Sequence, residues 1–184
     1  MSRDRLAGRL LVATPALRDV NFERTVVLML EHEEDGSLGV VLNRPSTADL
    51  DDPLREWRER AAAPAVVFVG GPVLRGTICL ARSEHTQPVE GWRPLFDRLG
   101  TLDLARTPAD IGVAVELLRV FVGYSSWGPS QLESEIAAGA WYVLDAAPGD
   151  AMSADPTRLW RTVLRRQPGL LGAVGTFPSD PCLN

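Results

Sequence analysis

The segment RTVVLMLEHEEDGSLGVVLNRP, residues 24–45, contains two apolar runs separated by a short acidic turn. The runs, about residues 25–31 and 38–43, are aliphatic and rich in β-branched residues, which is typical of strands. Asp35-Gly36 between them indicates a hairpin, because glycine accepts the positive φ angle that tight turns need. Both runs are apolar at nearly every position, so we expect a sheet that is covered on both faces.

Further apolar runs predict strands on either side of this hairpin. They cover residues 8–15, 64–73, 76–82 and 140–146. The first is ended by Pro15, and the second leads into a turn formed by Gly70-Gly71-Pro72. Residues 83–106 are punctuated by proline and glycine, so we expect only short strands or a loop there.

The segment TPADIGVAVELLRVFVG, residues 107–123, has the pattern of a helix. Thr107 can cap it, with Pro108 at the first helical position and Asp110 completing the cap. Four apolar residues recur at helical spacing and predict one apolar face: Ile111, Val115, Leu118 and Val122. We expect Gly123 to end this helix in the left-handed conformation.

Three other segments predict helices. One begins at Leu54 after Pro53, a second covers residues 130–139, and a third covers residues 155–169 with Leu159 and Val163 facing inward. The alternation of strands and helices predicts a layered domain of the mixed α/β or α+β class. A length of 184 residues fits a single domain over residues 1–184.

The composition excludes several classes of function. The net charge is -5, which gives no general attraction to nucleic acid or to an anionic membrane surface, so we expect no direct contact with either. All 19 basic residues are arginine. The chemistry of a lysine amine is therefore excluded, including Schiff bases, a pyridoxal anchor and the lysine of a P-loop.

The two cysteines, Cys79 and Cys182, lie far apart in the sequence and outside any CxxC pair. A metal site and a disulfide framework are therefore not expected, and a reducing compartment fits better. The N-terminus lacks an apolar run long enough for a signal peptide, and the longest apolar runs are strand-sized. We therefore expect a cytoplasmic protein without a membrane span, and no motif indicates a cofactor.

The segment GYSSWGPSQLESEI, residues 123–136, poses the main question of chemistry. Its first five residues differ by one position from the G-x-S-x-G nucleophile elbow, with Trp127 in place of the last glycine. A helix is expected before Gly123, whereas an elbow follows a strand. Ser130 and Glu133 instead form the S-x-x-E pattern of a capping box, with Leu132 and Ile136 facing the core. We interpret the segment as a corner before a helix, without a catalytic Ser125.

Two strand ends are candidate binding sites. Asn43-Arg44-Pro45 ends a buried strand, where Arg44 can bind a carboxylate or phosphate, or can form a structural ion pair. Gly70-Gly71-Pro72 can bring backbone N–H groups to an anion, or can form a simple turn. The acidic cluster around His32 lacks the spacing of a zinc or calcium site and predicts a solvated hairpin tip.

Several segments in this order resemble the YqgE/AlgH family of small bacterial proteins: LLVATP, the hairpin, VGGPV, GYSSWGPSQLESEIAAGAW and DPCLN. Ser126 and Ser130 replace glycines that are usual there, and Cys182 replaces a serine. The resemblance implies an αβα-type layered domain with a mixed sheet and a smaller α+β elaboration. It implies no established reaction. The family also carries the label of a transcriptional regulator. Because this chain is acidic and has no DNA-reading motif, we expect any such role to be indirect.

Two hypotheses for function follow. The first is a non-catalytic module that binds a partner protein or a small ligand where three corners of the fold converge. Its candidate residues are Asn43, Arg44, Pro45, Gly70, Gly71, Trp127, Gly128 and Gln131. The second is a hydrolase or nucleotide-acting enzyme that uses Arg44 with Ser125 or His32. The sequence favours the first and leaves the oligomeric state open.

Overall fold

A computed structural model describes residues 6–50 and 52–176 of the chain. Ten strands form one sheet, in which eight follow the order β10-β1-β2-β3-β9-β6-β8-β7 and β4 and β5 lie off this path. The strands are β1 (Arg9–Ala13), β2 (Val26–Glu33), β3 (Gly36–Val41), β4 (Pro45–Asp49), β5 (Val66–Val69), β6 (Val73–Ser83), β7 (Trp92–Phe96), β8 (Leu99–Leu102), β9 (Val115–Trp127) and β10 (Trp141–Asp145). All pairings are antiparallel except the one between β5 and β9.

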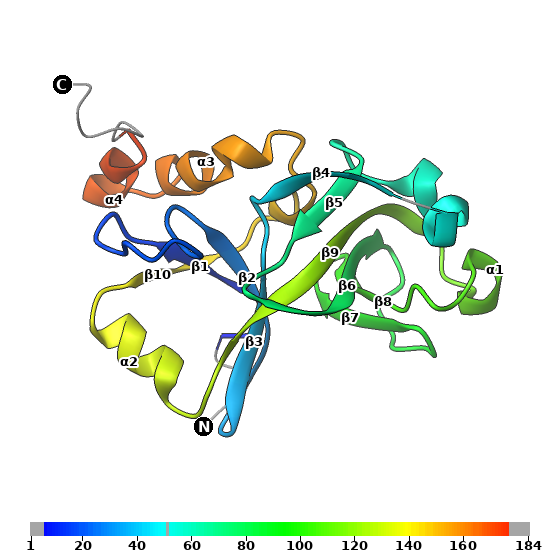
Figure 1. Cartoon of the computed structure of the whole chain (residues 1–184), viewed down its shortest axis with the longest axis horizontal. Coiled ribbons are helices and arrows are strands. Elements are labelled where there is room, and N and C mark those ends of the chain that lie inside the picture. The colour runs from blue at the N-terminus through cyan, green and yellow to red at the C-terminus, as the bar shows by residue number, and fades with distance from the viewer. Residues whose placement is uncertain (1–5, 51, 177–184) are drawn as a thin grey trace.

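The helices are short and lie around this sheet (Figure 1). The α-helices are α1 (Pro108–Ile111), α2 (Gln131–Ala137), α3 (Leu159–Arg165) and α4 (Gly169–Val174). The 3-10 helices are η1 (Asp52–Arg60), η2 (Asp150–Met152) and η3 (Pro156–Arg158). The chain is therefore a sheet-dominated α+β fold with a curled, mixed sheet. Over the residues described, an αβα layering of the whole molecule is not seen, because helices cover both faces only near β10-β1-β2.

The hairpin of β2 and β3 is confirmed, with Glu33 paired to Gly36 across the turn. Alternate residues of β2 enter two different cores. Leu28 packs in the cluster beneath α3, whereas Val27 and Met29 pack with Leu132 of α2. Both faces of the hairpin are covered, as its unbroken apolar runs predict.

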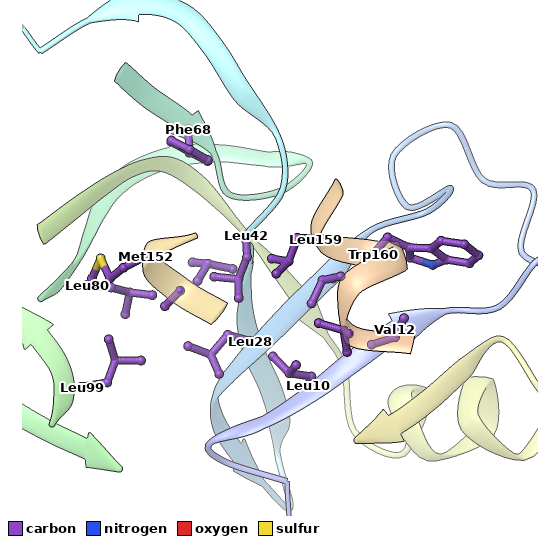
Figure 2. Close-up of a cluster of buried hydrophobic side chains, with 14 of the residues drawn as sticks. Leu10, Val12, Leu28, Leu42, Phe68, Leu80, Leu99, Met152, Leu159 and Trp160 are labelled. Carbon is purple, nitrogen blue, oxygen red and sulfur yellow. The ribbon is translucent and has the colours of Figure 1, made fainter. Parts of the chain in front are cut away.

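The largest core cluster joins α3 to the curled sheet (Figure 2). Leu159 and Trp160 of α3 lie over Leu10 and Leu28, and the ring nitrogen of Trp160 donates to the carbonyl of Ala13 at 2.8 Å. The expected helix over residues 155–169 is present as η3 and α3, and Leu159 and Val163 are buried as predicted.

The helix expected over residues 107–123 is wrong beyond Ile111. The cap is correct, because the Thr107 side chain accepts from the Asp110 amide and the Asp110 carboxylate accepts from the Thr107 amide. Gly112, at φ 64°, then ends α1, and the chain continues as the 13-residue strand β9. Its valine and aromatic residues favour a strand, and pairing with β3, β5 and β6 outweighs the helical spacing.

Gly123 has the expected left-handed conformation, φ 73°, but it lies inside β9. The capping box at Ser130 is also wrong. Ser130 has φ 58° and its side chain makes no cap hydrogen bond. Helix α2 itself is confirmed, with Leu132 fully buried.

Arg119 of β9 is a buried cation that sequence analysis did not single out. Its guanidinium donates to the carbonyls of Ala151 at 3.1 Å, Ala63 at 2.6 Å and Ser153 at 3.0 Å. It also lies over the ring of Phe68, 4.3 Å from the centroid. Burial lowers the pKa of Arg119 to about 10, so the side chain remains charged at neutral pH. It joins the 62–64 segment and η2 to the sheet.

Candidate functional site

Two of the predicted strand ends lie side by side where β5 leaves the sheet. The Val69 amide donates to the carbonyl of Arg44 at 2.9 Å, and the Gly70 amide donates to the carbonyl of Val122 at 2.9 Å. The carbonyl of Gly70 accepts from the Val41 amide at 2.8 Å. The backbone around Gly70 therefore bridges β3 and β9.

This bridge requires glycine on steric grounds. A Cβ atom on Gly70 would lie 2.3 Å from the carbonyl oxygen of Gly123. One on Gly71 would lie 2.3 Å from the backbone of Tyr124. Glycines here let two backbones approach more closely than any side chain permits. The Gly70-Gly71 pair is therefore a structural crossing of the chain over β9.

Asn43 holds the start of this site in place. Its side-chain oxygen accepts from the Val26 amide at 2.9 Å, and its side-chain nitrogen donates to the Arg24 carbonyl at 2.8 Å. Arg44 donates to the carbonyl of Glu23 at 3.1 Å. Within the part of the chain that the structure describes, no carboxylate forms an ion pair with Arg44. Its guanidinium therefore has donors left for a partner.

A shallow cleft of about 390 Å³ lies beside Arg44, Pro45 and Gly71. Its walls include Val20, which is 83% exposed, and Leu74, which is 70% exposed. Val69 also lines it and is paired in register with Val122 of β9. Val69 and Val122 are 39% and 40% exposed, so the cleft lies in an apolar face with an arginine in it.

Leu74 is exposed because β6 bulges at this point. The register of β6 against β9 shifts between Val73 and Thr77, and Gly76 has φ 75°. A bulge leaves its extra residues unpaired and turns their side chains away from the sheet. Leu74 is consequently presented to solvent beside Gly123.

Trp127, Gly128 and Gln131 lie at a different corner and do not line this cleft. Trp127 is buried and pairs with Ser37, further along β9. The Gly128 amide donates to the side-chain oxygen of Gln131 at 3.0 Å. Gln131 thus ties the bend before α2 to the first turn of that helix, and no side chain caps the helix itself.

Glu135 organises that corner, and sequence analysis missed it. One of its carboxylate oxygens accepts from the ring nitrogens of both Trp127, at 3.0 Å, and Trp141, at 2.9 Å. The other accepts from Gln131 at 3.0 Å. The available signal was a glutamate four residues after Gln131 on the helix, a spacing that places both on one face. The corner is held together by hydrogen bonds within the chain.

The two groups considered for catalysis are both hydrogen-bonded inside the fold. Ser125 is fully buried, and its hydroxyl donates to the carbonyl of Gly70 at 3.3 Å. The Nδ1 atom of His32 lies 2.8 Å from the Ser37 hydroxyl, and its Nε2 atom lies 3.5 Å from the carboxylate of Glu133. A strand does precede Ser125, contrary to our expectation, but its hydroxyl is not presented to a substrate.

The comparisons with known proteins agree with this architecture. A family model described as AlgH-like, DUF179, matches residues 10–171. The chain belongs to the AlgH-like family. A UPF0301 protein from Streptomyces coelicolor is 53% identical to this AlgH-like protein over 185 residues, which cover 97% of the chain and 95% of the relative. One from Thermobifida fusca is 46% identical over 194 residues, covering 100% and 98%.

Two solved structures are similar to the AlgH-like chain. Protein DIP2367 from Corynebacterium diphtheriae has a TM-score of 0.86 at 31% identity, covering 96% of this chain and 95% of that one. The AlgH protein from Pseudomonas aeruginosa has a TM-score of 0.65 at 26% identity, covering 98% of each chain. The resemblance to the YqgE/AlgH family is confirmed.

Residues 6–50 and 52–176 of the AlgH-like protein contain no cluster of three or more His, Cys, Asp or Glu side chains that could hold a metal ion. None of the helices in these ranges has the length and hydropathy needed to cross a membrane. Cys182 lies outside the described residues.

We expect Cys79 of the AlgH-like protein to be unreactive while the protein is folded. The side chain is only 2% exposed, and burial raises the pKa of its thiol well above the usual range. Because the thiolate is the reacting form, a Cys182→Ser variant should not react with Ellman's reagent until denaturant is added. If the folded variant reacts stoichiometrically, and as fast as an exposed thiol does, this expectation is contradicted.

Proposed function

We propose that this AlgH-like protein is a non-catalytic module that binds a partner protein through one face. We call it the crossing face and define it by Val20, Arg44, Val69, Leu74 and Val122. The observation that carries the proposal is the exposure of three large apolar side chains, Val20, Val69 and Leu74, in one cleft with an arginine. Val122, which is paired with Val69, extends this apolar surface. Contiguous apolar exposure with a polar element is typical of interaction sites.

The crossing face favours an extended acidic segment with apolar side chains. Arg44 offers a planar guanidinium that suits a carboxylate, and its present contact is with a carbonyl on the surface. The apolar residues on either side suit Leu- or Phe-like side chains. The cleft between them is shallow, which fits a peptide surface better than an enclosed substrate.

The enzymatic alternative has less support. It needs Ser125 or His32 as the reacting group, with Arg44 nearby. The Ser125 hydroxyl is hydrogen-bonded to Gly70, and His32 is held between Ser37 and Glu133. Neither side chain lines the cleft beside Arg44.

We propose a cytoplasmic location, in keeping with two cysteines that lie outside any disulfide-framework pattern. Any regulatory role would then be indirect. A net charge of -5 disfavours direct binding to DNA, so the protein would act on transcription through a protein partner at the crossing face.

The test compares charge substitutions at two exposed leucines. Leu74→Asp changes the crossing face, whereas Leu170→Asp is a matched control on α4, where Leu170 is 89% exposed. We expect proteins captured from the native host by the unmodified chain to be lost with Leu74→Asp and Arg44→Ala, and retained with Leu170→Asp. A direct binding measurement with the purified partner should then show a loss of at least ~10-fold for Leu74→Asp.

The proposal fails if Leu74→Asp and Leu170→Asp capture the same proteins equally well. Circular dichroism and the thermal unfolding midpoint of each variant show whether the fold is intact. Because both leucines are exposed, we expect changes in stability of less than about 0.5 kcal/mol in either variant.

A further inference from the structure

A second cleft, of about 480 Å³, is lined by residues of β2, β3, β6, β7 and β8. It lies between the tip of the β2–β3 hairpin and the sheet segment formed by β6, β8 and β7. The curl of the sheet brings these elements opposite one another, although they are distant in strand order (Figure 1). A volume of this size accommodates a small molecule.

The floor of this cleft is apolar and continuous with the core. Leu30 is buried in the main core cluster, and Leu38, Ile78 and Leu95 are partly buried against it. All four side chains line the cleft. The open end of the curled sheet therefore leaves part of the core uncovered, as at the mouth of a small barrel.

The strand register identifies the polar side chains on the same face. Thr101 of β8 is paired with Leu80 on one side and with Arg93 on the other. Directly paired residues share a face of the sheet, and Leu80 is fully buried in the core. Thr101 and Arg93 therefore lie on the core-facing side, at the rim of the cleft.

The rim of the cleft carries two carboxylates and one guanidinium. Glu31 and Glu33 both line the cleft, and Arg93 is the arginine that lines it. Arg93 is paired with Glu31 at 3.2 Å, but their side chains are 74% and 48% exposed. Such an exposed pair contributes little and opens readily. His32 is held by Ser37 and Glu133, and Glu34 and Asp35 follow in the turn, so the local charge is negative.

We propose that this cleft binds a small amphipathic cation. The ligand would have an aliphatic or aromatic body on the floor of Leu30, Leu38, Ile78 and Leu95, and a protonated amine between the carboxylates of Glu31 and Glu33. The apolar body gains from burial, and the ammonium group offsets the excess negative charge of the rim. This site is separate from the crossing face and does not depend on its function.

The test uses three probes with the same alkyl chain: hexylammonium, hexanol and hexanoate. Methyl NMR spectra of the full chain report on Leu30, Leu38, Ile78 and Leu95 during each titration. We expect all four side chains to shift with hexylammonium, with the affinity order hexylammonium, hexanol, hexanoate. Glu31→Gln should weaken hexylammonium binding by about two- to five-fold and leave hexanol unchanged.

Three further variants, with one substitute, complete the design. Arg93→Gln should tighten hexylammonium binding, because it removes the competing cation. Glu59→Gln, at an exposed position of η1, is the matched control and should have no effect. Ile78→Trp should fill the cleft and abolish the shifts. If Ile78→Trp does not fold, Thr101→Trp at the rim serves the same purpose.

The proposal is overturned if hexanoate binds as tightly as hexylammonium, or if Glu31→Gln and Glu59→Gln have equal effects. It is also overturned if the floor methyl groups do not shift at millimolar hexylammonium. A loss of partner capture by Leu74→Asp has no bearing on this result, so the two sites can fail separately.

Discussion

A Gly70→Ala variant should lose about 3 kcal/mol of folding free energy. Its new Cβ atom would lie 2.3 Å from the carbonyl oxygen of Gly123, which belongs to the central strand β9. A backbone atom cannot rotate away as a side chain can, so the segment that follows β5 must move away from β9. That separation would disturb the hydrogen bonds of Gly70 with Val122 and Val41. Urea unfolding followed by circular dichroism measures the loss.

Gly149→Ala is the matched control for this variant. Gly149 has φ -91°, and an added Cβ atom would meet nothing within 4 Å. We expect the control to change stability by less than about 0.5 kcal/mol, because the same methyl group is added in open space. Equal stability of Gly70→Ala and Gly149→Ala would show that the backbone at Gly70 does not approach β9 as closely as described.

An Arg119→Met variant should lose about 3–5 kcal/mol of folding free energy. The substitution keeps an unbranched apolar stem beside Phe68, but it removes the donors to Ala63, Ala151 and Ser153. Carbonyl groups left buried without donors cost free energy that methionine cannot offset. Denaturant unfolding gives the magnitude, and hydrogen exchange should show the greatest loss of protection near η2.

Arg119→Lys and Arg158→Met test the reason for that loss. Lysine keeps the charge but has a single nitrogen, so it cannot reach all three carbonyls, and we expect an intermediate loss. Arg158, whose side chain is 80% exposed, should tolerate methionine with a change below about 0.5 kcal/mol. Full stability of Arg119→Lys would instead mean that charge alone, without the planar fork, holds η2 to the sheet.

The parts of the fold that the sequence predicted correctly are those marked by several signals in neighbouring residues. The hairpin over residues 24–45 has unbroken apolar runs and an Asp-Gly turn, and both were confirmed. Helices α2 and α3 and strand β10 were also predicted from local patterns. The helices satisfy their own backbone groups and the two hairpin strands pair with each other, so nearby residues suffice to specify them. Strand β10 was recognised from its apolar run, although its partner is the distant strand β1.

Strand β9 shows where this reasoning fails. Val115, Leu118 and Val122 fit one face of a helix, yet they lie in a strand. Over this length the spacing of apolar residues does not distinguish a helix from a strand. Pairing with three strands from distant segments of the chain favours the strand. Gly123 was predicted to be left-handed for the wrong reason, since its conformation serves the crossing over β9 and not a helix end.

The candidate site was predicted only in part for the same reason. Sequence reasoning selected Arg44, Pro45 and Gly71, which the structure brings to one cleft, together with Trp127, which lies at another corner. It could not select Leu74, because a leucine in a strand is usually buried. Its exposure follows from a bulge in β6 that the sequence pattern does not reveal.

The sequence by itself determined the hairpin, the family and the absence of lysine chemistry, because each depends on residue identity or on local order. Only the tertiary structure decided which glycines touch, which cation is buried and which apolar side chains remain in solvent. Those properties depend on distances between segments far apart in the chain. Gly70 and Gly123 are 53 positions apart, and only the folded sheet places them against one another.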